Sequence, residues 1–129
     1  MRPTKSEYYL DIAAVVAKRS TCNRRQYGAV IVKDDRIIAT GYNGSARGMS
    51  NCCDTGNCVR TGLPHNTGYT SACPAVHAEA NALLSAGREA KGATLYLAGW
   101  ENGQRIEYPT PCEMCMRLLI NSELAEVRG

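Results

Sequence analysis

The stretch that decides the fold is Gly28-Ala29-Val30-Ile31-Val32-Lys33-Asp34-Asp35-Arg36-Ile37-Ile38-Ala39-Thr40-Gly41. It contains two runs, 28–33 and 36–41, that are rich in β-branched residues, which favour strands. Asp34-Asp35 separates the two runs, and a two-residue polar connection of this kind is typical of a tight turn between paired strands. The sequence therefore predicts a β-hairpin over residues 28–41.

Helices and strands are expected to alternate on both sides of this hairpin. Residues 6–19 predict a helix, because Leu10, Ala13 and Ala17 recur at helical spacing. The remaining expected elements are a helix over 77–86 that ends at Gly87, a strand over 93–97, a turn over 101–104 with a return through 106–108, a helix over 112–121 and a strand over 125–128. This order predicts an α/β domain of three layers, with helices on both faces of a mixed sheet.

Length and composition indicate one globular domain over residues 1–129, with 44% hydrophobic and 21% charged residues. No apolar run is long enough to span a membrane, and residues 1–5 lack the pattern of an export signal, so we expect a cytoplasmic protein. The formal net charge of +3 suits an anionic small molecule and is weak evidence for nucleic acid. The last expected strand stops at Gly129, which suggests a missing C-terminal tail.

Seven cysteines stand beside only two histidines. An odd number of cysteines cannot all form disulfides, and without an export signal the thiols are expected to stay reduced. They are then either metal ligands or buried thiols. Cys52, Cys53, Cys58 and Cys73 lie between residues 42 and 76, a segment without convincing periodicity. A loop of this length inside a compact domain is uncommon unless it is functional or held in place.

Two short motifs each begin an expected helix: His77-Ala78-Glu79, and Cys112-Glu113-Met114-Cys115 directly after Pro111. Cys112 and Cys115 lie one helical turn apart, so both sulfurs can face the same point. The N-terminus of a helix also favours the thiolate that a metal needs. Together with His77 they make three ligands, the number found in catalytic zinc sites that keep a fourth position for water.

Glu79 could reach such a water without binding the metal. Zinc makes its bound water acidic, and a nearby carboxylate can act as general base and then as general acid. Attack at C4 of a cytosine ring would replace its amino group by oxygen. The H-x-E…P-C-x-x-C pattern is that of zinc nucleobase deaminases. The alternatives are a core histidine beside two buried thiols, or a non-catalytic zinc-stapled nucleotide-binding module.

Four segments carry a resemblance to one family: Arg19–Val32, Ala39–Gly44, His77–Ala82 and Gly92–Tyr96. They closely resemble the deoxycytidylate (dCMP) deaminase family, and the likeness covers nearly the whole chain. The resemblance implies the cytidine-deaminase-like fold and zinc-dependent conversion of dCMP to dUMP with ammonia release, which supplies thymidylate synthesis. It also implies a homo-oligomer, a dimer or hexamer, often regulated by dCTP and dTTP.

The resemblance assigns roles by position. The zinc ligands match His77, Cys112 and Cys115, the proton shuttle matches Glu79, and the substrate contacts match Asn43 at the sugar, Arg24 at the 5′-phosphate, and Ala78. Arg47 is an alternative phosphate ligand, because either arginine offers a two-pronged donor to phosphate.

Members of the family often hold a second, structural zinc. Its expected ligands are Cys22, Cys53, Cys58 and Cys73, with Cys52 or His65 as replacements. The chain departs from the family pattern in the cysteine-dense segment 50–73 and in residues 99–108, just before the Pro-Cys motif. We expect the second segment to lie beside the site, where it could alter recognition of the base or the phosphate, or an oligomer contact. Both departures leave the exact nucleotide open. Another substrate of the same fold, such as dCTP, cytidine, guanine or a tRNA adenosine, is the alternative.

Overall fold

The hairpin expected over residues 28–41 is present and longer than the sequence predicts. Strand β1 (Arg25–Lys33) pairs antiparallel with β2 (Arg36–Tyr42). The turn residues Asp34 and Asp35 have φ values of 53° and 59°, the left-handed conformation required at both centres of a type I′ turn. The structure is a computed structural model that describes residues 1–49, 51 and 75–129.

The sheet is mixed, as expected. Strand β5 (Thr94–Glu101) lies on the other side of β1 and is antiparallel to it. A turn at Asn102 and Gly103 leads into β6 (Gln104–Arg105), which pairs antiparallel with β5, whereas β7 (Glu126–Arg128) pairs with β5 in parallel. Strands β1 and β5 both extend beyond their predicted ends. The reason is that they continue to pair with each other through residues that are not β-branched.

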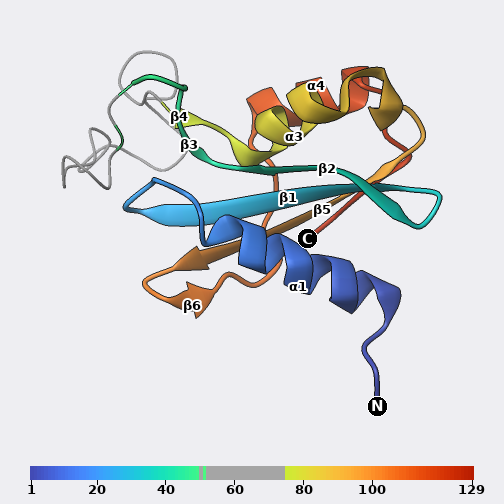
Figure 1. The fold of residues 1–129 in the computed structure, drawn as a ribbon, viewed down its shortest axis with the longest axis horizontal. Coiled ribbons are helices and arrows are strands. Elements are labelled where there is room, and N and C mark those ends of the chain that lie inside the picture. The colour runs from blue at the N-terminus through green and yellow to red at the C-terminus, as the bar shows by residue number, and fades with distance from the viewer. Residues whose placement is uncertain (50, 52–74) are drawn as a thin grey trace.

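Helices lie on both faces of the sheet (Figure 1), and alternate residues of β1 pack in the two core clusters on these opposite faces. Val30 and Val32 pack in a core cluster with residues of helix α1 (Lys5–Ala17). Ala29 and Ile31 pack on the other face in a cluster with residues of helices α3 (Ala78–Ala86) and α4 (Glu113–Asn121). This alternation is the two-residue period of a strand buried on both faces. The predicted three-layer α/β/α fold is therefore confirmed.

Local signals fix the ends of the helices. Thr4 caps α1 in a reciprocal capping box, in which Glu7 N donates to Thr4 Oγ1 and Thr4 N donates to Glu7 Oε1. Helix α1 ends at Ala17, two residues before the predicted end. Gly87, with a φ of 58°, ends α3, and a short 3₁₀ helix over Gly87–Ala90 follows it.

The segment between β2 and α3 carries regular structure at its two ends. Strand β3 (Gly44–Ser45) pairs antiparallel with β4 (Ala75–Val76), so the expectation of an unstructured segment over 42–76 is wrong there. Cys52, Cys53, Cys58, His65 and Cys73 lie outside the described residues. No helix in the described part of the chain is long and apolar enough to cross a membrane.

Candidate active site

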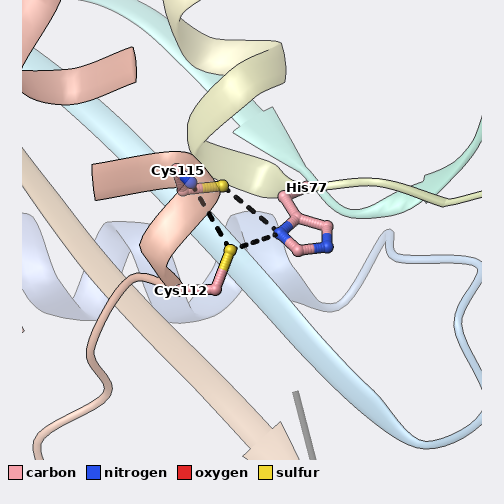
Figure 2. A group of neighbouring side chains, drawn as sticks. All are labelled: His77, Cys112 and Cys115. Atoms are coloured by element: carbon pink, nitrogen blue, oxygen red, sulfur yellow. Dashed lines mark hydrogen bonds between the residues drawn. The ribbon is translucent and has the colours of Figure 1, made fainter. Parts of the chain in front are cut away.

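His77, Cys112 and Cys115 form one group at the adjacent starts of α3 and α4 (Figure 2). His77 Nδ1 lies 3.2 Å from Cys115 Sγ and 3.5 Å from Cys112 Sγ. The three candidate ligand atoms all lie within 4.8 Å of one another. The structure thus brings His77 to two cysteines that lie more than thirty positions further along the sequence.

The local structure explains how the two sulfurs reach the same point. Cys112 is the N-cap of α4 and Cys115 lies in its first turn, and Cys115 N donates to Cys112 Sγ at 3.4 Å. His77 occupies the corresponding N-cap position of α3. Packing of Leu119 with Ala78 in one core cluster holds the two helices together.

The geometry of this group fits a zinc ion. With Zn–S of about 2.3 Å and Zn–N of about 2.0 Å at a tetrahedral angle, sulfur and nitrogen ligands lie about 3.5 Å apart. The separations of 3.2 and 3.5 Å in the structure are close to this value. Two thiols and an imidazole also form a donor set that zinc prefers over magnesium or calcium. The residues present therefore fit zinc with three protein ligands.

Burial controls the protonation of this group. Removal from water is the main cause that raises the pKa of the Cys115 thiol, with smaller contributions from the charges of Glu79 and Cys112. A metal that binds Cys115 must therefore displace a proton, which makes metal affinity dependent on pH.

Glu79 lies in the first turn of α3 and is almost completely buried, with 5% of its surface exposed. Burial raises its pKa above the ordinary glutamate value, and a hydrogen bond from its own backbone opposes this effect more weakly. A carboxyl group with a raised pKa holds a proton more readily than an ordinary glutamate, which suits a group that must both accept and return a proton. Its position and burial match the requirements of a general acid–base group.

A cavity of about 240 Å³ joins these residues to the remaining candidates. Its lining is Cys22, Arg24, Arg25, Tyr27, Asn43, Ala75, His77, Ala78, Glu79, Leu97, Ile106, Tyr108, Pro109, Thr110, Pro111 and Cys112. The predicted substrate contacts Arg24, Asn43 and Ala78 therefore share one cavity with Glu79. Arg47 is exposed and does not line it, so its expected phosphate contact stays a prediction.

Asn43 is fixed by the backbone of β1. Its side-chain amide donates to the Arg25 carbonyl at 3.0 Å, and its Oδ1 accepts from Tyr27 N at 2.8 Å. The residue is 8% exposed, and it retains a second amide hydrogen that could serve a ligand. These two hydrogen bonds hold the Asn43 side chain, which follows β2, against β1 in the wall of the cavity.

Sequence reasoning missed several lining residues. Arg25 and Tyr27 are two residues apart on β1 and both line the cavity. Their shared face could have been predicted only if the predicted strand had begun at residue 25 and not at residue 28. Ile106 and Tyr108 belong to the segment 99–108, which the sequence predicts to lie beside the site, and both line the cavity as expected. Pro109 follows them and also lines the cavity, without a signal of its own. Tyr108 has a φ of 48°, uncommon for a residue other than glycine.

A three-ligand zinc group, a buried glutamate two residues after the histidine, and helices on both faces of a mixed sheet define the class of zinc-dependent nucleobase deaminases. The family model described as "Cytidine and deoxycytidylate deaminase zinc-binding region" matches residues 3–128. The chain belongs to this family, and the family predicted from the sequence is confirmed.

Individual proteins of this family are similar to the chain over most of its length. The chain is 41% identical to the deoxycytidylate deaminase of Mycobacterium phage D29, with 98% of this chain and 94% of that protein covered. It is 46% identical to the deoxycytidylate deaminase of Schizosaccharomyces pombe, over 74% of this chain but only 30% of that longer protein. The dCMP deaminase of cyanophage S-TIM5, solved in complex with dCMP and dUMP, superposes with a TM-score of 0.71 at 26% identity, over 98% of this chain and 81% of that one.

Proposed function

We propose that this chain deaminates dCMP to dUMP, with water as co-substrate and ammonia as product. The observation that carries the proposal is the position of Glu79, a buried carboxyl group that shares one cavity with His77, Cys112 and the predicted phosphate contact Arg24. A purely structural zinc site has no use for a buried carboxyl group that is not a ligand. The names of the relatives and the nucleotides bound in the phage structure support the same substrate.

His77, Cys112 and Cys115 would hold the zinc ion, which when bound supplies a Lewis acid that lowers the pKa of water. Glu79 accepts a proton from the attacking water and delivers it to the cytosine ring nitrogen. The oxygen of that water bonds to C4 of the ring. Glu79 then takes the proton of the new C4 hydroxyl and passes it to the amino group, the C4–N bond breaks, ammonia leaves and C4 becomes the carbonyl carbon of dUMP. Its burial keeps bulk water from this carboxyl group and from the proton that it holds.

The rest of the cavity positions the nucleotide. Asn43, rigidly held by β1, contacts the sugar through its remaining amide hydrogen, and Ala78 offers its small side chain and backbone beside Glu79. Arg24 contacts the 5′-phosphate. Arg47 stays a second candidate, for which the cavity gives no support.

A second, structural zinc remains part of the proposal. Its expected ligands are Cys22, Cys53, Cys58 and Cys73, of which only Cys22 is described; it lines the cavity with an unpaired thiol. Metal analysis of purified protein tests this point. Two zinc ions per chain support the second site, and a single ion per chain contradicts it.

We also propose that the chain forms a homo-oligomer in the cytoplasm, with dCTP and dTTP as effectors. Helix α4 supports the assembly, because it buries Cys115 and Leu119 while apolar side chains on both sides of them stay exposed. These exposed residues are Met114, Met116, Leu118 and Ile120. An apolar helix face of this kind is typical of a surface that a partner covers. The measurable consequences are a molar mass above that of one chain, and a change in dCMP turnover when dCTP or dTTP is added.

A substrate panel tests the activity. Purified protein with a measured zinc content is incubated separately with dCMP, dCTP, cytidine, guanine and an adenosine-containing RNA, and ammonia release is followed. Ammonia from dCMP at the highest kcat/KM is the expected result. Preference for another member of the panel would make the chain a deaminase of that substrate, and no ammonia from any member would favour a nucleotide-binding module.

A further inference from the structure

The first residue of β1 and the last residue of β5 face each other across the sheet. Arg25 and Glu101 are register partners, and Arg25 Nε donates to Glu101 Oε2 at 2.8 Å. Arg25 Nη1 also donates to the Tyr27 hydroxyl at 3.4 Å. These two contacts use two of the five N–H groups of the guanidinium and hold it in one orientation. Arg25 lines the cavity, whereas Glu101, beside it on β5, is not among the lining residues.

The pair lies at the end of the cavity away from Glu79. Leu97 of β5 lines the cavity and packs in one cluster with Ala78, beside Glu79. Glu101 lies four residues further along β5, about 13 Å at the rise of an antiparallel strand, a distance comparable to the length of a nucleotide. The cavity therefore runs along the sheet from the acid–base group to Arg25.

Tyr27 forms the floor between these two ends. Its ring crosses β5 at Gly99, where an added Cβ would come within 2.7 Å of the ring. Glycine at this position therefore lets the ring lie flat against the strand. Its hydroxyl reaches Arg25, so the floor and the charged end form one connected unit.

The charges at this end are unequal. Arg24 and Arg25 supply two positive charges to the lining, and Glu101 supplies one negative charge directly beside Arg25. Among the lining residues that the structure describes, the remaining charged residue is Glu79, at the other end. The formal charge that the described residues give to the Arg25 end is thus +1, enough to attract one phosphate group but small for a chain of three.

We propose that the Arg25–Glu101 pair selects nucleotides with a single phosphate: Arg25 binds the phosphate, and Glu101 both orients Arg25 and repels further phosphate groups. This inference rests on the proposed function, because it assumes that a nucleotide occupies the cavity. A phosphate monoester carries about −1.5 to −2 charges near pH 7, and each added phosphate brings more negative charge toward Glu101. Charge-assisted hydrogen bonds from a pre-oriented arginine are stronger than those from a mobile one.

The pair is tested by binding of reaction products, which needs no turnover. Calorimetry measures the dissociation constants of deoxyuridine, dUMP and dUTP for the zinc-loaded wild type, Arg25→Gln and Glu101→Gln. Arg25→Gln is expected to weaken dUMP about tenfold or more and to affect deoxyuridine much less, because the nucleoside lacks the phosphate. Glu101→Gln is expected to lower the ratio of the dUTP to the dUMP dissociation constant about fivefold or more, because it removes the repelling charge.

Glu126→Gln is the matched control. Glu126 Oε2 accepts from Arg128 Nε at 2.8 Å, the same atoms and distance as in the Arg25–Glu101 pair, and neither residue lines the cavity. This variant also loses one negative charge, yet it should leave the three dissociation constants unchanged. Thermal melts of all variants identify any that unfold.

Three results would overturn the assignment. They are equal losses of dUMP and deoxyuridine binding in Arg25→Gln, an unchanged dUTP to dUMP ratio in Glu101→Gln, and a wild type that binds dUMP no more tightly than deoxyuridine. Ammonia release from dCMP on the same samples separates this inference from the proposed function. Turnover with any of the three results contradicts the pair alone, whereas the expected binding pattern without turnover contradicts the deaminase alone.

Discussion

Gly41 of β2 lies directly against Ala78, the residue between His77 and Glu79. A Cβ added at Gly41 would come 2.6 Å from the Ala78 carbonyl oxygen and 2.5 Å from Ala82 N. The first turns of α3 thus contact the backbone of β2 at Gly41, with no side chain between them. This close approach places the start of the helix, and with it the two functional side chains, at a fixed height above the sheet.

Gly41→Ala should therefore damage both stability and activity. The added methyl must push α3 away from β2, and overpacking of this kind costs about 1–3 kcal/mol. The displacement also moves Glu79 relative to Cys112, which lies on another helix. The expected results are a lower melting temperature and a lower kcat/KM for dCMP. Thr40→Ala, at an exposed position of the same strand, is the control. Wild-type kinetics in Gly41→Ala would show that the contact does not position the site.

Glu79→Gln should retain zinc and lose activity. Glutamine has nearly the same shape but cannot accept and return a proton, so kcat should fall by a factor of about 10² or more. The metal-free variant should be at least as stable as the wild type, because a buried carboxyl group is removed. Zinc content, kcat and melting temperature are measured together, with the exposed Glu113→Gln as control. Undiminished turnover would refute the assigned mechanism.

Cys112→Ser should lose the metal. A serine hydroxyl is a poor zinc ligand near neutral pH, and the remaining pair of ligands binds zinc weakly. Since a ligand present at 100 times its dissociation constant stabilises the fold by about 2.7 kcal/mol, the melting temperature should fall to that of chelator-treated wild type. Added zinc should restore the wild type alone. Equal recovery of the variant would mean that Cys112 is not a ligand.

Asp35→Asn should remove part of the acid sensitivity of the fold. Hydrogen bonds from Lys5 and then from Tyr9 lower the pKa of Asp35, so this carboxylate stabilises the folded state above its unfolded pKa of about 3.9. That contribution is lost as the pH falls through the lowered folded value. The wild type should therefore be the more stable protein at pH 6, and the difference should shrink below pH 4.

Urea unfolding at several pH values measures this effect. Asp34→Asn is the matched control, because both aspartates occupy left-handed turn positions that suit asparagine equally. The pKa of Tyr9 is a second readout of the same contact, because the hydrogen bond with Asp35 raises it to about 12. A difference between wild type and Asp35→Asn that stays constant from pH 6 to pH 2 would contradict the prediction.

Leu118→Lys should disrupt the proposed homo-oligomer. Leu118 is 44% exposed on the apolar side of α4, and a lysine there would bury a charge in any interface that covers this face. Light scattering coupled to size-exclusion chromatography should show a smaller molar mass than for the wild type. Gln104→Lys adds the same charge to an exposed position of β6, outside α4, and should leave the mass unchanged. A Leu118→Lys mass equal to that of the wild type would place the interface elsewhere.

Most of the fold could be predicted because its signals are local. β-branched runs around Asp34-Asp35 predicted the central hairpin, and helical spacing with flanking glycine and proline predicted α1, α3 and α4. The predicted ends were less accurate. Arg25–Tyr27 and Ala98–Glu101 belong to strands only because β1 and β5 pair with each other there, and pairing between distant segments leaves no local pattern.

The sequence by itself determined the chemistry at the metal group. A helix start requires Cys112 and Cys115 to share one side, and the motifs around His77 and Glu79 carry the same local geometry. Only the tertiary structure decided what lies opposite that chemistry. It turned Arg25 into the cavity and placed Glu101 beside it, and it brought Tyr108 to the cavity wall while Arg47 stays outside. The reason is physical: helix geometry repeats within four residues, whereas a cavity forms from whichever distant segments the packing of sheet and helices brings together.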